Sequence, residues 1–498
     1  MIWRAEWIKF RTVRGWPAGL AASALIVVAL GVLFATGSRM SCMNGDQEIT
    51  CPTPPANADG VAVQDRFAFT HRSLSGDGEI TAKVGGIDST ITYPPPNHDR
   101  IVSGTLAWSK AGLMIKDGTE QGADYAAVLL TGARGVRMQS GFTEDQAAPG
   151  FATAKEAWLR LTRAGEQITA WASADGAAWQ KIDTVRLKGL PDTVQIGLFV
   201  TSPGGLTVDE KPEGGHVVAV RFTQTTAEFS QVSPGGGWTD TLVGYTGYRT
   251  DWEKGHPPGH TETGGVITVA GSGDIAPQNQ SEGLAVERVL TGVFAGLLPL
   301  IVVAALWGAA EFRHRMIAST LVAMPHPVRV SVAKAGVVAA ASLVAGLVAV
   351  AVAMPVTLRL MAANGVVMLP TPVLTTVRVA VGTALLLALA GVLAYGMGSL
   401  LRRAVPAVVA VTALLIAPPI LAVTSVLPTE AGAWLLRLTP GAAFAIQQSI
   451  PAYPQLSTPQ TVFDGYFPLA PWAGLAVLAL YALTAVAAAT WRLRRSVA

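Results

Sequence analysis

The chain has 498 residues, of which 50% are hydrophobic and only 14% are charged, with a formal net charge of +3. A composition this apolar excludes an ordinary soluble protein and indicates a membrane protein. The charge is unevenly distributed, because residues 41–287 hold 18 Lys and Arg against 29 Asp and Glu, while the rest of the chain holds 18 basic and 4 acidic residues. The sequence therefore predicts an acidic soluble domain inserted into a basic membrane protein.

Residues 1–15 form an amphipathic start to the chain. Trp3, Trp7 and Phe10 recur at helical spacing with basic residues between them, so we expect a helix that lies in the membrane interface. The apolar run 16–37 that follows is long for the core of a signal peptide, and no small-residue cleavage site follows it. It is therefore expected to be the first transmembrane helix.

A linker rich in Gly, Pro and Asn occupies residues 38–60 and contains both cysteines of the chain, Cys42 and Cys51. Two cysteines close together in an extracytoplasmic segment favour a small loop closed by a disulfide, and two unrelated thiols are the alternative. We expect the disulfide to have a structural role without redox chemistry.

Short strands with alternating polar and apolar residues fill residues 61–205, and Gly and Asp-Gly turns separate them. This pattern predicts an all-β sandwich or jelly roll, and Asp175-Gly176 is a strong hairpin signal. Further strands follow in residues 206–287, and the pattern leaves open whether they complete the same sandwich or form a second unit.

Several runs in this β region resemble the laminin-G-like and concanavalin-like domains. They are Trp108 to Gly112, Trp158 to Leu161, and Ser173 to Gly176 with Trp179. The resemblance implies a glycan ligand, with calcium in some members. The quoted residues are of the types that fill cores and turns, so no sugar-binding residue follows from them. A β domain without its own ligand is the alternative.

Five more apolar runs are long enough for the ~20 residues that a membrane-spanning helix needs. They are residues 288–310, 335–358, 376–400, 404–427 and 469–491. Pro418-Pro419 is expected to kink the fifth span in its middle. Residues 428–468 are apolar in part but interrupted, which indicates a re-entrant or interfacial segment on the extracytoplasmic side.

If the six spans leave both termini in the cytoplasm, most basic residues of the membrane part lie on the cytoplasmic side, and those of the tail 492–498 are among them. The predicted fold is thus a polytopic α-helical membrane protein with six transmembrane helices. An extracytoplasmic all-β domain is inserted between the first and second helices. The expected location is the bacterial plasma membrane, with both termini in the cytoplasm.

The loop 311–334 is the long polar break between the second and third spans. Glu311 and Arg315 lie one helical turn apart and are expected to pair, an interaction worth about 0.5 kcal/mol. Pro325 and Pro327 end the first helix of the loop, and a second short helix from about Val328 leads into the third span. A basic loop that only sets membrane topology is the alternative.

This loop resembles the cytoplasmic loop of permease subunits of ABC-2 type ABC transporters, a family of bacterial exporters. The matching residues are Glu311, Phe312, Arg313, His314, Thr320, Leu321, Pro325, Arg329 and Lys334. Arg315-Met316 stands where the family usually has Gly-Thr. The resemblance implies a coupling helix, including Arg315, that docks on a separate ATP-binding subunit, and a homodimer or a heterodimer with another permease. Ala5 to Lys9 and Thr439 to Ala442 also resemble the family.

No Gly-x-x-x-x-Gly-Lys-Ser/Thr loop occurs in the chain, so ATP and magnesium are expected on the partner subunit and no cofactor on this chain. His256 and His260 lack an evident third ligand, so no metal site is expected. The six spans hold no ionisable residue in their cores, which argues against ion-driven transport.

The sequence therefore predicts the permease subunit of an ATP-driven exporter, a transporter subunit and not an enzyme. Membrane lipids are its other expected partners, and no nucleic acid is expected. The first alternative is a membrane-anchored glycan or cell-wall receptor that uses the β domain. A glycan-acting enzyme is a weaker alternative, because no paired carboxylates stand out on the strands.

Overall fold

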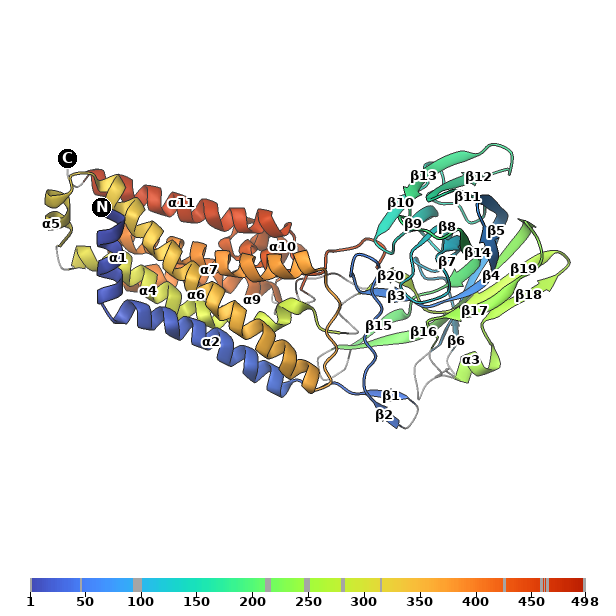
Figure 1. Cartoon of the computed structure of the whole chain (residues 1–498), viewed down its shortest axis with the longest axis horizontal. Coiled ribbons are helices and arrows are strands. Elements are labelled where there is room, and N and C mark those ends of the chain that lie inside the picture. Colours follow the sequence, from blue (N-terminus) through green and yellow to red (C-terminus); the bar gives the residue numbers. More distant parts are fainter. Residues whose placement is uncertain are drawn as a thin grey trace.

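The computed structural model describes residues 2–44, 47–92, 101–210, 216–245, 251–278, 283–313, 316–423, 427–456, 460, 462 and 465–495. The protein has two parts, a helical bundle and a β domain beyond one end of it (Figure 1). Helix α1 (Ile2–Thr12) and the last turns of α11 (Pro471–Arg495) lie at the opposite end of the bundle, here called the terminal end. The end next to the β domain is called the β end.

Within the described residues, six helices are long and apolar enough to cross a membrane, as expected of a multi-pass membrane protein. They are α2 (Gly15–Gly37), α4 (Val293–Arg313), α6 (Pro327–Ala363), α7 (Val373–Leu401), α8 (Ala404–Leu415) continued by α9 (Ala417–Val423), and α11 (Pro471–Arg495). The fifth span breaks between α8 and α9, immediately before Pro418-Pro419, because proline lacks the N–H that the helix needs.

The third span differs from the prediction. A single helix, α6, starts at Pro327 and runs through to Ala363, so the expected short helix from Val328 is the first part of the span itself. Pro327 takes the first helical position, where its missing N–H costs nothing. No residue between Val328 and Lys334 then interrupts the helix.

Glycines let α4 and α7 approach closely. A Cβ atom on Gly308 would lie 2.4 Å from the carbonyl oxygen of Tyr395, and one on Gly398 would lie 2.3 Å from that of Ala305. Both contacts are with backbone, which cannot move aside. Small residues at such crossings are typical of helix pairs in membranes.

The segment expected to be re-entrant forms α10 (Thr429–Leu438) and a 3₁₀ helix, η2 (Pro440–Gln447), at the β end. Every residue of η2 is buried, and η2 packs against α7 and α11. A second 3₁₀ helix, η1 (Val286–Leu290), precedes α4. The carboxylate of Glu287 in η1 accepts hydrogen bonds from the backbone N–H and the hydroxyl of Ser449, which ties η1 to the residues after η2.

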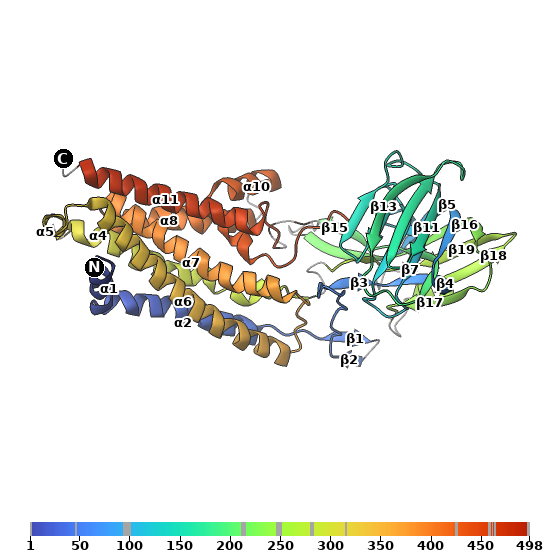
Figure 2. The ribbon, with the colours of Figure 1, turned by 45° about the horizontal axis from the view of Figure 1, so that its top comes forward.

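The β domain consists mainly of two antiparallel sheets packed face to face (Figure 2). One has seven strands, in spatial order β10 (Glu144–Ala147), β9 (Val136–Ser140), β8 (Tyr125–Thr131), β7 (Lys110–Lys116), β14 (Thr193–Thr201), β4 (Phe67–Ser75) and β17 (Thr239–Val243). The other has nine, in the order β13 (Gln180–Arg186), β12 (Gln167–Ser173), β11 (Ala157–Ala164), β5 (Gly78–Thr92), β16 (His216–Ser233), β19 (Val266–Gly271) and β18 (Gly259–Thr263), with β6 (Ile101–Ser103) on β5 and β15 (Gly205–Glu210) on β16. A short helix, α3 (Asp251–Gly255), precedes β18.

The boundary predicted at residue 205 does not divide the sandwich. Strand β16 pairs with β5 on one side and β19 on the other, and β17 extends the seven-stranded sheet. A further pair, β3 (Val63–Asp65) with β20 (Ile275–Pro277), joins the start of the domain to its end. Residues 206–278 therefore complete the same sandwich, a question that the sequence left open.

The residues that carry the laminin-G-like resemblance have packing and turn roles. Trp108 is buried, and Trp158 packs on Gly176, where a Cβ atom would lie 2.7 Å from the indole. The carboxylate of Asp175 accepts hydrogen bonds from the backbone N–H groups of Ala177 and Ala178, both at 2.9 Å. These contacts shape the turn between the paired strands β12 and β13, where the sequence predicts a hairpin.

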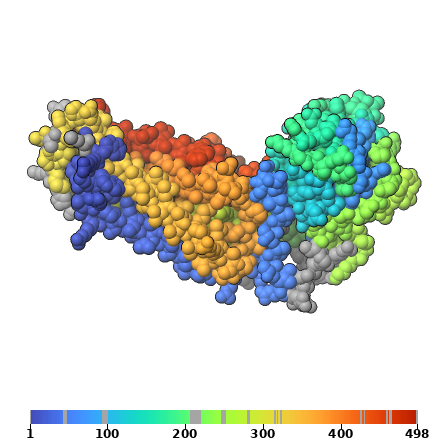
Figure 3. Space-filling model, viewed as in Figure 1, coloured from blue at the N-terminus to red at the C-terminus, as the bar shows by residue number. Residues whose placement is uncertain are grey.

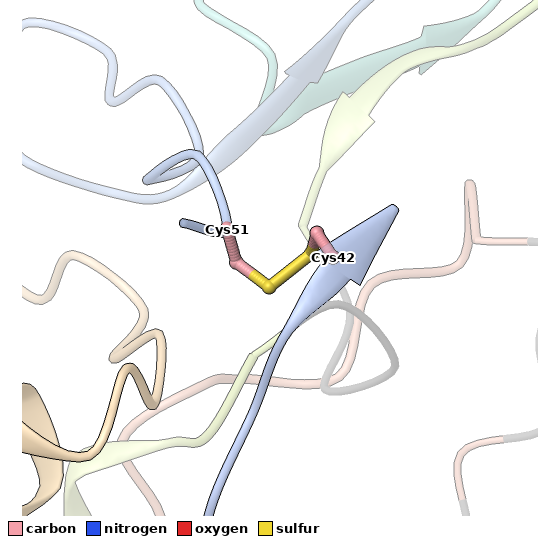
Figure 4. The surroundings of a disulfide bond; sticks show 2 residues. All are labelled: Cys42 and Cys51. Carbon is pink, nitrogen blue, oxygen red and sulfur yellow. A yellow bond between two sulfur atoms is a disulfide. The ribbon is translucent and has the colours of Figure 1, made fainter. Parts of the chain in front are cut away.

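A disulfide joins Cys42 and Cys51 in the linker between α2 and the β domain (Figure 4). Cys42 begins β1 (Cys42–Asn44), which pairs with β2 (Gln47–Ile49). This is the pairing that the sequence favours.

The β domain contacts three connections of the bundle. Gln455, in the connection between η2 and α11, is buried and donates hydrogen bonds to the carbonyl oxygens of Phe142 (3.2 Å) and Thr143 (3.1 Å). A small apolar cluster beside it brings together residues before α4, between α6 and α7, and between η2 and α11. Its members are Ala62, Ala285, Leu369, Ile450 and Tyr466.

Candidate functional site

The loop between the second and third spans lies at the terminal end, on the left in Figure 3. Helix α4 ends at Arg313, and α5 (Met316–Ala323) turns the chain back toward α6. The N–H of Met324 bonds to the carbonyl of Thr320 at the end of α5, and Pro327 then starts α6. The structure therefore has the bent elbow that the two prolines predict.

The two ends of this elbow meet in an ion pair. Lys334 Nζ lies 2.6 Å from Glu311 Oε1, and both residues are buried. The sequence predicts Arg315 as the partner of Glu311, but Arg315 and His314 lie outside the described residues. Lys334 lies in α6 and Glu311 in α4, so their ion pair closes the elbow at its base.

Helix α1 (Ile2–Thr12) adds two more charges to this pair. Lys9 Nζ lies 2.7 Å from Glu6 Oε1 and 3.5 Å from Glu311 Oε1, and Lys334 Nζ lies 3.8 Å from Glu6 Oε2. Glu6, Lys9, Glu311 and Lys334 form what we call the four-charge cluster. It holds two carboxylates and two ammonium groups, so its charges balance, which is what makes buried charges tolerable.

The exposure of the cluster is uneven. Glu6, Glu311 and Lys334 are each less than a tenth exposed, whereas about half of the Lys9 side chain is exposed. Burial lowers the pKa of the Lys9 ammonium, but the hydrogen bonds and charges of Glu6 and Glu311 outweigh this effect and raise that pKa above its usual range. Lys9 therefore stays protonated while it faces both carboxylates.

Aromatic rings pack beneath the cluster. Lys334 Nζ lies 5.0 Å from the centre of the Trp307 ring, and Phe10 and Trp16 contact the same ring edge-on. Trp3 packs so closely on α6 that a Cβ atom on Gly336 would be 1.9 Å from its indole. These contacts hold α1 across the end of the bundle, beside α6 (Figure 1).

Hydroxyl groups from three spans lie next to the cluster. Thr490 donates a hydrogen bond to the hydroxyl of Ser331 (2.9 Å), Tyr395 to the carbonyl of Ser331 (3.3 Å), and Ser399 to the carbonyl of Gly308 (3.2 Å). A small, partly open cavity lies between these groups and the cluster. It is lined by Gly308, Glu311, Phe312, Ile317, Val330, Ser331, Lys334, Tyr395, Ser399, Ala489 and Leu493.

The outer surface of the elbow is apolar on α5 and basic around it. Val322 is 87% exposed and Met316 is 47% exposed. Pro325 and Arg329 are also exposed, and Thr320 and Phe312 are half-buried, the latter with the guanidinium of Arg402 5.1 Å from its ring centre. Arg313 and Leu321 belong to α4 and α5, and their side chains lie outside the described residues.

The terminal end is positively charged on its outside. In the described part of the chain, its acidic residues are Glu6 and Glu311, and both are buried. Exposed basic residues surround them: Arg4, Arg11, Arg14, Arg329, Arg403, Arg492, Arg494 and Arg495. A partner that binds this end meets cations and apolar side chains but no exposed carboxylate of the described residues.

Sequence reasoning identifies Glu311 and Lys334 but misses the part that Glu6 and Lys9 play. A signal is present, because Glu6 falls between Trp3 and Phe10 on one side of α1, and a lone acid on an apolar stripe indicates a buried partner.

The two histidines considered for a metal have separate contacts: His256 stacks on Trp252, and His260 Nδ1 lies 2.8 Å from Asp240 Oδ1. No group of three metal-ligating side chains occurs among the described residues.

Comparison with protein families and with curated proteins gives no match. Among solved structures, two peptidases cover 42% of this chain and 99% of their own. They are SCP-B, an eqolisin in complex with the tripeptide Ala-Ile-His (TM-score 0.24, 9% identity), and Scytalido-glutamic peptidase with a peptide-based transition-state analogue (TM-score 0.23, 11% identity). Sheep galectin-11 in complex with glycerol covers 26% of this chain and 93% of its own (TM-score 0.15, 14% identity). At such low TM-scores and identities, these likenesses imply neither a shared fold nor a shared activity.

Proposed function

We propose that the chain is the permease subunit of an ATP-driven ABC-2 type exporter in a bacterial plasma membrane. In this proposal the terminal end faces the cytoplasm, the β domain lies outside, and a separate ATP-binding subunit docks on the elbow. The basic exposed surface of the terminal end supports this orientation, because basic residues flanking spans are retained in the cytoplasm.

The observation that carries the proposal is the closure of the elbow by Glu311 and Lys334. A loop that only sets topology needs positive charge but no fixed shape. Here a balanced, buried cluster fixes the base of the elbow against α1, while α5 presents Met316 and Val322 outward. A rigid base with an exposed apolar tip is suited to receive force from a partner and pass it to α4 and α6.

The substitution Val322→Asp tests this assignment. Val322 is 87% exposed, so its replacement leaves the fold intact but puts a carboxylate at the centre of the docking surface. Val220→Asp, at a 57% exposed valine of the β domain, is the matched control. The chain is co-expressed with each ATP-binding-cassette protein of its host in turn. We expect Val322→Asp to abolish the co-purification and ATPase stimulation seen with the wild type, and Val220→Asp to preserve both. Normal association of the Val322→Asp variant would favour a loop that only sets topology.

A membrane-anchored receptor is the competing function. It predicts that no ATP-binding subunit associates with the wild-type chain at all. The wild-type arm of the same co-purification therefore separates the two functions.

A further inference from the structure

The outward side of α1 carries cations next to indole rings. Arg4, Trp7 and Arg11 are spaced three and four residues apart, which places them on one side of the helix, and all three are exposed. Arg14 follows at the turn into α2 and is exposed as well. Among the described residues, no acidic side chain forms an ion pair with any of these three arginines. The side that faces the bundle holds Glu6 and Phe10 instead.

The position of α1 indicates which partner this side meets. The helix lies across the end of the bundle and leads directly into the first span (Figure 1), so its outward side is at the level where a membrane ends. Exposed Trp3 and Trp7 are residues that prefer this interface. At the same end of α11, the guanidinium of Arg495 lies 3.8 Å from the ring centre of exposed Trp491. Indole and guanidinium groups thus recur together around the terminal end.

We propose that the outward side of α1 binds the headgroups of anionic phospholipids. Arginine guanidinium groups bind phosphate through several N–H donors, and the half-exposed indoles pack beside the upper acyl chain. Arginines near an anionic membrane surface strengthen attachment to it by about fivefold each. Arg4, Arg11 and Arg14 therefore favour an anionic over a zwitterionic lipid at this position.

The four-charge cluster connects this lipid site to the elbow, a step that rests on the proposed function. Lys9 and Glu6 belong to α1, and they contact the same two residues that close the elbow. A shift of α1 on its lipid therefore changes the distances from Lys9 and Glu6 to Glu311 and Lys334. We expect anionic lipid to set how firmly the base of the elbow is held.

Lipid binding is tested without any ATPase. The full-length chain is placed in nanodiscs with equal amounts of phosphatidylglycerol and phosphatidylcholine, extracted with mild detergent, and its retained lipids are counted by mass spectrometry. We expect several-fold enrichment of phosphatidylglycerol on the wild type and a ratio near one on Arg4→Gln/Arg11→Gln/Arg14→Gln. The control Arg39→Gln/Arg359→Gln/Arg437→Gln removes three arginines at the β end and should keep the enrichment. Unchanged enrichment on the α1 variant overturns the lipid site.

The connection from the lipid site to the elbow is tested by comparing the stimulation of the ATP-binding subunit in phosphatidylglycerol nanodiscs and in phosphatidylcholine nanodiscs. We expect the wild type to respond to phosphatidylglycerol, and the variant Glu6→Gln/Lys9→Gln to retain the lipid but lose the response. A full response in that variant overturns the connection through the cluster. If the α1 variant loses the ATPase and keeps its lipid enrichment, the outward side of α1 binds the protein partner and the lipid proposal is wrong. If the proposed function itself is wrong, the wild-type chain enriches the lipid but binds no ATP-binding subunit.

Discussion

Glu311 and Lys334 mark the two ends of the loop between the second and third spans, and their side chains meet at 2.6 Å. Both are buried, so water solvates neither charge well and each charge needs the other to compensate it. Removing one partner of a buried pair is costly because it leaves the remaining charge uncompensated.

We expect Glu311→Gln to destabilise the protein by about 3 kcal/mol, toward the low end for a broken buried pair because half-exposed Lys9 gives the site access to water. The double variant Glu311→Gln/Lys334→Gln should recover much of this loss. Thermal unfolding of the detergent-solubilised chain, arranged as a double-mutant cycle, measures the coupling. Additive effects of the two substitutions would contradict a direct pair.

This burial also corrects an expectation from the sequence. Pairing with Arg315 on an exposed helix implies that Glu311→Arg costs only about 0.5 kcal/mol. In the structure, that substitution places a third cation against Lys9 and Lys334 in a buried site. It therefore perturbs folding and cannot report on docking alone, which is why exposed Val322 is the better position for that test.

Gly398→Ala should be strongly destabilising. Its Cβ atom would lie 2.3 Å from the carbonyl oxygen of Ala305, which forces α4 and α7 apart and should cost about 1–3 kcal/mol. Gly432→Ala is the control, because its Cβ atom would meet only Ala422 at an ordinary 3.5 Å in α10. Thermal unfolding should show a clear loss for the first variant and none for the second. Equal behaviour of the two would mean that the helices are not in close contact at Gly398.

The β domain should fold alone as residues 61–278 but not as residues 61–205. The shorter fragment lacks β16, which lies between β5 and β19, and so exposes the unpaired edge of β5. The strand pattern of 61–205, taken from the sequence alone, predicts instead that the shorter fragment folds, so the experiment decides between the two expectations. Circular dichroism and size-exclusion chromatography of both fragments provide the check. A monomeric, β-rich 61–205 fragment would show that the later strands are dispensable.

The turn at Asp175 should be sensitive to acid. Hydrogen bonds from the backbone N–H groups of Ala178 and Ala177 and from the hydroxyl of Ser173 lower the pKa of the Asp175 carboxyl from 3.8 to about 2. A lowered folded-state pKa gives stability that is present above the unfolded value and is lost as pH falls through about 2. An NMR titration of the 61–278 fragment measures this pKa. The stability advantage of the wild type over Asp175→Ala should shrink over the same pH range, and a pKa near 4 would contradict the hydrogen bonds.

The six long apolar helices could be predicted because a run of about 20 apolar residues is visible in the local sequence. The break at Pro418-Pro419 and the elbow with its prolines follow from equally local rules. The continuity of α6 does not follow from hydropathy, because the apolar run of the third span begins only at residue 335, after the charges of Arg329 and Lys334.

The rest depends on contacts between distant parts of the chain. The local signal at Glu6 of α1 indicates a buried partner, but the spacing of charges within one helix does not identify that partner as Lys334 of α6. For the same reason, the strands of 206–278 show their β character in the sequence but not that β16 lies beside β5.

The attachment of the β domain at the β end has a mechanical consequence. The apolar cluster around Leu369 and Tyr466 and the hydrogen bonds of Gln455 hold the sandwich to connections that belong to different spans. If two of those spans tilt relative to each other, the sandwich has to rotate with one of them or lose its contact with the other. Because the sandwich extends far beyond the bundle (Figure 1), a small tilt at its base becomes a large displacement at its outer edge. A change in the orientation of the sandwich therefore reports a change in the arrangement of the helices in amplified form.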